Sequence, residues 1–246
     1  MNTNPFSRTM EGMRQLFKYN KVWGIILIVI GVISLPSYFD RNKGTADTSI
    51  TNPFNENVDV NWPAVVLFVS FLAVVSLLVM SYTYGVMYYI IWKNSRKEKA
   101  SLGDAFRAVG ARYWTILAVM IMSAFRIIGG LLLLVVPGVR ALLRYQLVLM
   151  PVFDENLKAK DAMARIKKLT DGHLIEVAGL SIVAGVLPVV GPAMQVGGEG
   201  ILYNDLKLLE NHKGEQPKAH WLNYALVVLM VVIAVVFIAV GISESK

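Results

Sequence analysis

Residues 137–172 read PGVRALLRYQLVLMPVFDENLKAKDAMARIKKLTDG and contain the pattern on which the fold depends. A Pro-Gly pair opens an apolar run that carries Arg140 and Arg144 and ends at the acidic pair Asp154 and Glu155. A basic amphipathic segment follows. Charges inside an apolar run are costly in a membrane, so they mark either an internal ion pair or a ligand path. The stretch therefore predicts a membrane-spanning helix followed by a basic helix at the membrane surface.

The composition of the 246-residue chain is typical of a membrane protein. Apolar residues make up 55% and charged residues 17% of the sequence, whereas about a quarter of a soluble domain is charged. The net charge is +7, but the bases lie at the ends of apolar runs, so nucleic-acid binding is not expected. The sequence has no Cys and only three scattered His. We therefore expect no disulfide, no metal site and no cofactor.

The first half of the chain predicts an interfacial helix and two spans. Residues 5–21 place apolar side chains three and four apart among bases, as in a helix that lies on a membrane surface. The apolar residues 22–39 are long enough to cross about 27 Å of hydrocarbon, and residues 63–92 form a second run that ends in an aromatic band. The polar residues 40–62 contain only two bases, which predicts an external loop and a cytoplasmic N-terminus.

The middle of the chain predicts the third and fourth spans. Residues 93–112 are the most basic connection and should be cytoplasmic, with a capping box at Ser101 and Asp104 that starts a short in-plane helix. The third span, residues 113–136, carries Arg126. The fourth follows the Pro-Gly turn directly and ends at Phe153. The bases of residues 158–168 place the next helix at the cytoplasmic surface.

Residues 174–202 allow two interpretations. One kinked helix would put residues 203–220 outside, whereas two short helices would return them to the cytoplasm. A weak repeat, in which an acid-led amphipathic segment precedes a ring residue and an apolar pair, begins at Glu11, Asp104 and Asp161. The first two copies precede hairpins, which favours two helices for the third.

The predicted fold class is an all-α polytopic membrane protein. Residues 1–210 should form six core spans in three hairpins, each introduced by an in-plane amphipathic helix. Residues 211–246 should form a linker and a seventh span, because residues 221–242 are long and apolar.

Short motifs in the chain resemble a large bacterial superfamily of uncharacterised six-helix integral membrane proteins, which includes the membrane domain of some glycerophosphoryl diester phosphodiesterases. They are Arg144-Tyr145, Pro151-Val152, Asp154-Glu155-Asn156, Asp161-Ala162, Arg165, Gly172 and Tyr203-Asn204-Asp205-Leu206-Lys207. The resemblance covers roughly residues 5–210, with Asn204 and Lys207 where a second aromatic residue and an arginine are common. It implies a six-helix core and a cytoplasmic Tyr-x-Asp segment. It implies no reaction, because the phosphodiesterase chemistry belongs to a separate soluble barrel.

Four charged residues are expected inside the hydrocarbon. Arg126 lies about 18 Å along its helix from Trp114, and Arg144 lies about 9 Å from the Pro-Gly turn on the same face as Arg140. Two helices in residues 174–202 would bring Glu199 to a similar depth. The leading hypothesis pairs Arg126 or Arg144 with Glu199. The alternatives are a pocket for an anionic lipid headgroup or phosphate, and a proton or ion path through Glu199.

Five residues form a candidate cytoplasmic motif. Asp154 and Glu155 are interpreted as exposed loop acids that face Lys158 and Arg165, since no nucleophile or base is fixed beside them. Tyr203 and Asp205 either seat their loop on the basic helices or belong to a solvated turn. No phosphate loop, nucleophile elbow or zinc motif occurs, so no catalytic residue is assigned.

These features predict a non-enzymatic scaffold or accessory protein of a cytoplasmic or inner membrane. Its expected partners are anionic lipids and either another protein or a second copy of the chain. The alternative is a small transporter with Arg126, Arg144 and Glu199 along its path, and a lipid-modifying enzyme ranks third. A transporter requires a cavity that reaches these residues, whereas a scaffold has a closed core and an exposed apolar groove.

Overall fold

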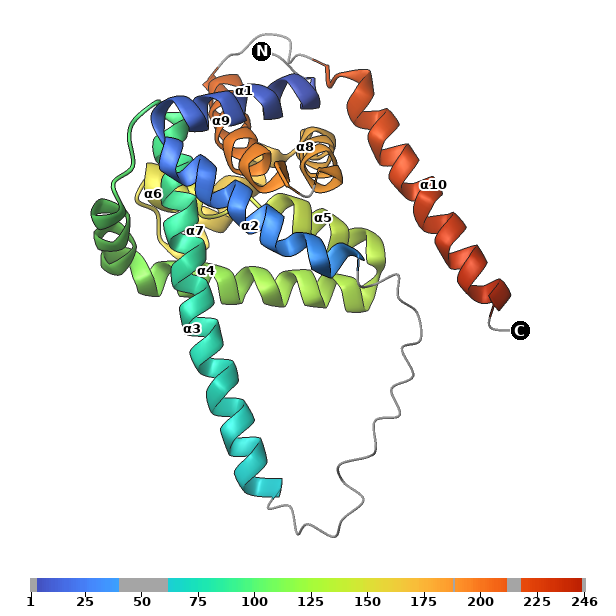
Figure 1. The fold of residues 1–246 in the computed structure, drawn as a ribbon, viewed down its shortest axis with the longest axis horizontal. Coiled ribbons are helices and arrows are strands. Elements are labelled where there is room, and N and C mark those ends of the chain that lie inside the picture. The colour runs from blue at the N-terminus through green and yellow to red at the C-terminus, as the bar shows by residue number, and fades with distance from the viewer. Residues whose placement is uncertain (1–3, 40–61, 188, 212–217, 245–246) are drawn as a thin grey trace.

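The computed structural model describes residues 4–39, 62–187, 189–211 and 218–244, and these are helical with no strand (Figure 1). The all-α prediction is confirmed. The predicted external loop, except for Trp62, and residues 212–217 of the linker lie outside the described residues. The helices are α1 (Pro5–Tyr19), α2 (Lys21–Phe39), α3 (Trp62–Ser95), α4 (Leu102–Leu133), α5 (Val135–Tyr145), α6 (Met150–Asp154), α7 (Ala159–Thr170), α8 (Leu174–Val186), α9 (Gly191–Asn211) and α10 (Trp221–Glu244).

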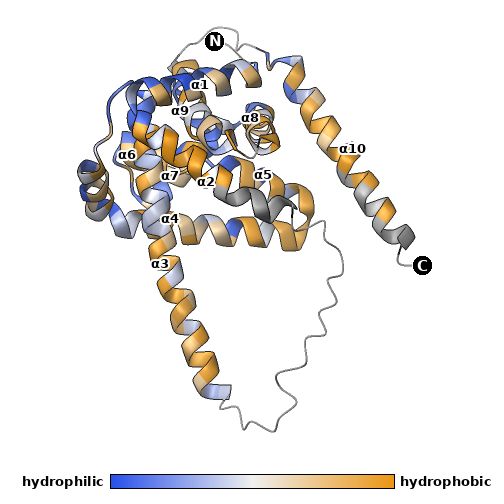
Figure 2. Cartoon of the chain, viewed as in Figure 1, coloured by the Kyte–Doolittle hydropathy of each residue, from blue (hydrophilic) through white to orange (hydrophobic). Residues whose placement is uncertain are grey.

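Three segments among the described residues are long and apolar enough to cross a membrane. They are α3, α4 and the stretch Val135–Asp154, which α5 and α6 form together. A fourth exists if α7 and α8, which are bent by 94° to each other, count as one broken span. Figure 2 shows that the coloured parts of α3 and α10 are mostly hydrophobic, whereas α1 is largely hydrophilic. The chain is thus compatible with a membrane protein, with fewer long apolar helices described than the seven predicted spans.

The prediction of a short helix after Ser101, separate from the third span, is wrong, because α4 runs without a break from Leu102 to Leu133. Ser101 is the N-cap residue of α4, but its side chain makes no capping hydrogen bond. One buried stripe explains the continuity. Ala105, Val109, Ile116 and Val119 are buried along a single face, so both predicted parts pack on the same neighbours.

Helix α3 crosses α4 instead of lying antiparallel to it (Figure 1). The crossing point is Gly85, where an added Cβ would lie 2.9 Å from Val109 and 3.1 Å from Ile116. The first half of α3 extends away from the other helices, and its side chains up to Met80 are exposed. Helix α2 packs on α1 and α9, and an apolar pocket of about 310 Å³ lies between α2 and α3. The first predicted hairpin is therefore not a tightly packed pair.

The predicted fourth span is broken into α5 and α6. Residues 146–149 form turns between the two helices, and Pro151 lies in the first turn of α6. Proline has no N–H, and its ring clashes with the carbonyl four residues earlier, so it disrupts a regular helix at this point. At the other end α4 and α5 approach closely. An added Cβ on Gly130 would lie 2.9 Å from the Cα of Gly138.

Residues 174–202 contain two helices, as the sequence repeat favoured. The helices are antiparallel, because Ala184 lies against Gly191 and Leu180 lies against Gly198. Helix α9 nevertheless continues to Asn211, so residues 203–211, which were predicted to be part of a loop, are helical. Helix α10 packs along α8, where the Asn223 side chain covers Gly179.

Helix α1 belongs to the core, although the sequence predicted a surface helix. Its buried face carries Arg8, Thr9, Gly12 and Leu16 and packs mainly on α9. Amphipathicity indicates that one face of a helix is buried but not whether lipid or protein covers it. In this chain the cover is protein.

Candidate functional site

A central cavity of about 560 Å³ lies between α3, α4, α5, α8 and α9. Each helix turns one face toward it, since the lining residues are three, four or seven apart along α3, α4 and α9. The lining residues are Tyr84, Met87, Tyr88, Met120, Ser123, Ile127, Leu142, Tyr145, Gln146, Val148, Leu149, Ser181, Pro192, Gln195, Val196 and Glu199.

The Glu199 carboxylate is the only acidic group among the described residues that line this cavity. Its side chain is buried, and its Oε1 accepts hydrogen bonds from Nε2 of Gln146 at 2.7 Å and Nε2 of Gln195 at 2.9 Å. Its Oε2 is buried and has no hydrogen-bond partner among the described residues. The Tyr88 hydroxyl lies beside the carboxylate, but its one hydrogen is donated to the backbone carbonyl of Gln146.

The break between α5 and α6 supplies the main partner of this carboxylate. Gln146 is the first residue after α5, and its Oε1 accepts a hydrogen bond from Ser181 Oγ at 2.9 Å. A polar chain thus runs from Ser181 on α8 through Gln146 to Glu199 on α9. Irregular backbone at membrane depth is tolerated where it lines a cavity, and broken helices of this kind form substrate sites in transporters.

The chemistry of the cavity suits a cation or a hydrogen-bond donor. No Lys or Arg is among its described lining residues, so nothing there neutralises the carboxylate. An unpaired charge is costly to bury, and a positively charged ligand would offset that cost. No group of three or more His, Asp or Glu that could hold a metal is found in the described residues. The Oε2 atom of the carboxylate is a hydrogen-bond acceptor, so it fits the N–H donors of an ammonium group.

The predicted pairing of Arg126 or Arg144 with Glu199 is wrong. Arg126 is exposed and donates to the Tyr145 hydroxyl at 3.0 Å, whereas Arg144 forms an ion pair with Asp171 at 3.3 Å. Arg140 is exposed. The reason is helical geometry, because Gln146 lies two residues beyond Arg144. Two residues correspond to a rotation of roughly 200°, so these side chains point to opposite sides.

Four of the five predicted motif residues meet at the other end of the bundle. Asp154 accepts hydrogen bonds from Arg96 at 2.5 Å, from Lys207 at 2.5 Å and from the Tyr203 hydroxyl at 3.2 Å. The Asp154 side chain is only 6% exposed, so its interpretation as an exposed loop acid is wrong. These bonds tie the turn that follows α3 to α6 and α9.

Glu155 and Arg165 extend this network as the sequence predicted. Arg165 Nε lies 2.9 Å from Glu155 and its Nη1 lies 2.6 Å from Glu210. Hydrogen bonds from Lys168 and Arg165 lower the pKa of Glu210, which lies beyond the apolar part of α9. Each carboxylate therefore has cationic partners, and the network is structural and not a vacant binding site.

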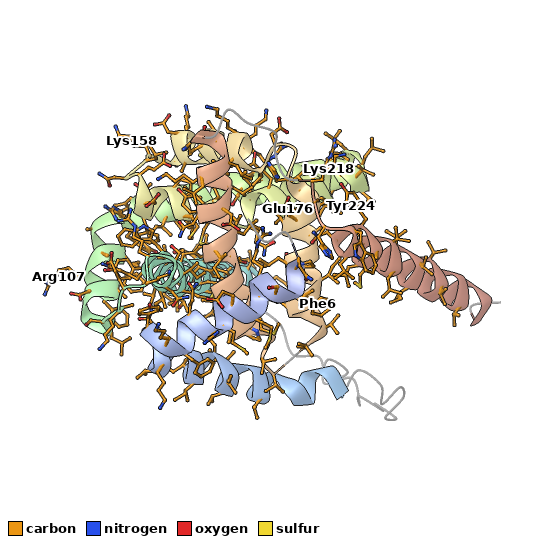
Figure 3. All side chains as sticks on the ribbon, turned by 90° about the horizontal axis from the view of Figure 1, so that it is seen from above. Phe6, Arg107, Lys158, Glu176, Lys218 and Tyr224 are labelled. Atoms are coloured by element: carbon orange, nitrogen blue, oxygen red, sulfur yellow. The ribbon has the colours of Figure 1, made fainter. Side chains whose placement is uncertain are left out.

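Asp205 belongs to a third cluster, which sequence reasoning missed. Arg8 is 2% exposed and lies 3.3 Å from Asp205 and 3.5 Å from Glu176. Glu176 also contacts His173 at 3.3 Å. Figure 3 shows Glu176 in the interior, whereas Lys158 points outward. The available signal was Glu176 itself, an acid inside an apolar run that needed a cation.

No protein-family model, curated protein or solved structure matches the chain. The resemblance of its motifs to the bacterial six-helix superfamily therefore stays a prediction. Function has to be inferred from the cavity, the buried carboxylate and the break between α5 and α6.

Proposed function

We propose that the protein is a small transporter or permease that binds a cationic, hydrogen-bond-donating solute at Glu199. The observation that carries this proposal is the buried Oε2 atom, which has no partner among the described residues although it lines a cavity of about 560 Å³. A buried polar atom without a partner is costly, and an ammonium group would supply the missing donor.

The proposed topology has six core spans in three hairpins, a seventh span and a cytoplasmic N-terminus. The antiparallel pair α8 and α9 and the close pair α4 and α5 support two of the hairpins. The bases that follow α3 and those of α7 support a cytoplasmic position for these segments. A cytoplasmic or inner membrane of a cell is the proposed location.

The cavity favours a transporter over a scaffold, because a scaffold needs only a closed core. The proposed path differs from the one expected from sequence. It includes Glu199 but neither Arg126 nor Arg144, since neither arginine lines the cavity.

Interaction with anionic lipids is a second candidate function, and it has its own observation. Arg126 and Arg140 are exposed on the α4–α5 hairpin, where the neighbouring side chains of residues 131–136 are exposed and apolar. An exposed guanidinium on an apolar surface is a suitable partner for a lipid phosphate. This interaction is compatible with transport.

The test of the main proposal measures ethylamine binding to the purified protein at neutral pH, with uncharged ethanol as the ligand control. Glu199→Gln keeps the shape of the side chain but removes its charge, so we expect binding to weaken roughly tenfold or more. The matched control is Asp171→Asn, which removes an exposed carboxylate and should leave binding unchanged.

Uptake of labelled ethylamine into proteoliposomes then separates a transporter from a protein that only binds. We expect uptake by the wild type and its loss in Glu199→Gln. Equal binding of ethylamine and ethanol, or unchanged binding by Glu199→Gln, would overturn the assignment of the site. Binding without uptake would overturn transport.

A further inference from the structure

A second pocket adjoins the central cavity. It measures about 310 Å³ and lies between α2 and α3, and Phe106 of α4 and Val196 of α9 also line it. Met87 and Val196 line both spaces, so these two side chains form the wall between them. The remaining lining residues are Trp23, Ile26, Leu27, Ile30, Tyr82, Thr83, Val86 and Ile90.

The two spaces differ in chemistry. The hydroxyls of the second pocket are already satisfied, since Tyr82 donates to the carbonyl of Phe106 at 3.0 Å and Thr83 donates to the carbonyl of Val79 at 2.9 Å. Most of the other lining side chains are aliphatic. The central cavity, in contrast, holds a carboxylate and two amides. The pair therefore offers a polar end and an apolar end to one ligand.

The wall lies close to the carboxylate. Val196 and Glu199 are three residues apart on one face of α9, which corresponds to a rise of about 4.5 Å. Met87 lines the same boundary from α3, and its unbranched side chain has three rotatable bonds that let it adopt other shapes. A chain attached to a group at Glu199 thus has a short route past Met87 into the second pocket.

We infer that the solute is an amphipathic amine, with its ammonium group at Glu199 and its aliphatic tail in the α2–α3 pocket. This inference rests on the proposed function and specifies its substrate class. An apolar tail gains affinity as it leaves water, by about fourfold for each methylene that is fully buried. A short amine would occupy the central cavity alone and bind more weakly.

The test compares ethylamine, butylamine and octylamine binding to the full-length protein in one detergent, with octanol as the control for partition into micelles. For the wild type we expect affinity to rise with tail length by roughly threefold to fourfold per methylene. Octanol should bind far more weakly than octylamine, because it lacks the charge that pairs with Glu199.

Two variants block the tail from opposite helices. Thr83→Trp fills the α3 side of the pocket and Ile26→Trp fills the α2 side, and each should abolish the dependence on tail length while ethylamine affinity stays within a factor of about two, because neither residue lines the central cavity. Retained ethylamine binding also reports that the variant is folded. Val29→Trp is the matched control, because Val29 lies on α2 but lines neither space.

The outcomes separate this inference from the function on which it rests. Equal affinity for ethylamine and octylamine in the wild type, or unchanged tail-length dependence in both blocking variants, would overturn the amphipathic substrate and leave the amine site intact. If the wild type binds none of the three amines, the proposed function itself is overturned. A rise with tail length that both blocking variants abolish and Val29→Trp retains supports the inference.

Discussion

Gly12 of α1 and Gly197 of α9 meet backbone to backbone: a Cβ added to Gly12 would lie 2.2 Å from the carbonyl carbon of Gly197. Any side chain at either position would push the helices apart. The contact lies two residues before Glu199, so α1 supports the helix that carries the candidate site.

Gly12→Ala should destabilise the protein by about 1–3 kcal/mol or more, because the methyl group meets backbone that cannot move aside. The matched control is Gly110→Ala in α4, where an added Cβ has nothing within 4 Å and alanine is the better helix former. Thermal unfolding in detergent, followed by circular dichroism, measures both. A Gly12→Ala protein as stable as the control would contradict the close contact.

Arg8→Met should destabilise the fold by about 3–5 kcal/mol, since it leaves Glu176 buried without its guanidinium partner. Adding Glu176→Gln to the same protein should recover part of the loss, because the second change removes the unpaired charge. Arg14→Met removes an exposed arginine of α1 and should stay within roughly 0.5 kcal/mol of the wild type. Unfolding midpoints in denaturant would test this, and equal effects of the two arginine changes would rule out the buried cluster.

Replacement of both Arg126 and Arg140 by leucine should reduce the amount of anionic lipid that copurifies with the protein. The two exposed guanidinium groups lie on an apolar hairpin, where they have few other counterions. Replacement of both Lys158 and Lys160 by leucine removes two exposed bases at the proposed cytoplasmic side and is the control for net charge. Native mass spectrometry would count the bound lipids. Equal lipid retention by the double variant and the control would exclude a site on α4 and α5.

The side of the membrane on which the linker lies can be tested with single cysteines, because the chain has no Cys of its own. The proposed topology places both Lys160 and Lys218 in the cytoplasm. A membrane-impermeant maleimide should therefore label Lys160→Cys and Lys218→Cys only after the cells are opened. Labelling of Lys218→Cys in intact cells, with Lys160→Cys still protected, would show that α8 and α9 do not return the chain to the cytoplasm.

The sequence predicted the helices better than it predicted which helices pack against one another. Apolar runs and the repeat at Asp161 correctly indicated an all-helical chain and two helices between residues 174 and 202. Periodicity shows which face of a helix is buried, but it does not show what covers that face. The sequence therefore could not reveal that Arg8 lies against Glu176.

The prediction of the candidate site was incomplete for the same reason. Glu199 was recognised as a buried charge, but its assumed partners were arginines, because charge suggests an opposite charge. The real partners are the neutral amides of Gln146 and Gln195. Gln146 could be found only once the break after α5 was known, since an unbroken helix would turn this side chain elsewhere.

The amide of Gln146 also limits how many molecules the site can hold. Its Oε1 accepts from Ser181 and its Nε2 donates to Glu199. With Gln195 as the second donor, the two lone pairs of the Glu199 Oε1 are filled. Only Oε2 remains to accept from a ligand, and the single negative charge of Glu199 predicts a stoichiometry of one amine per chain.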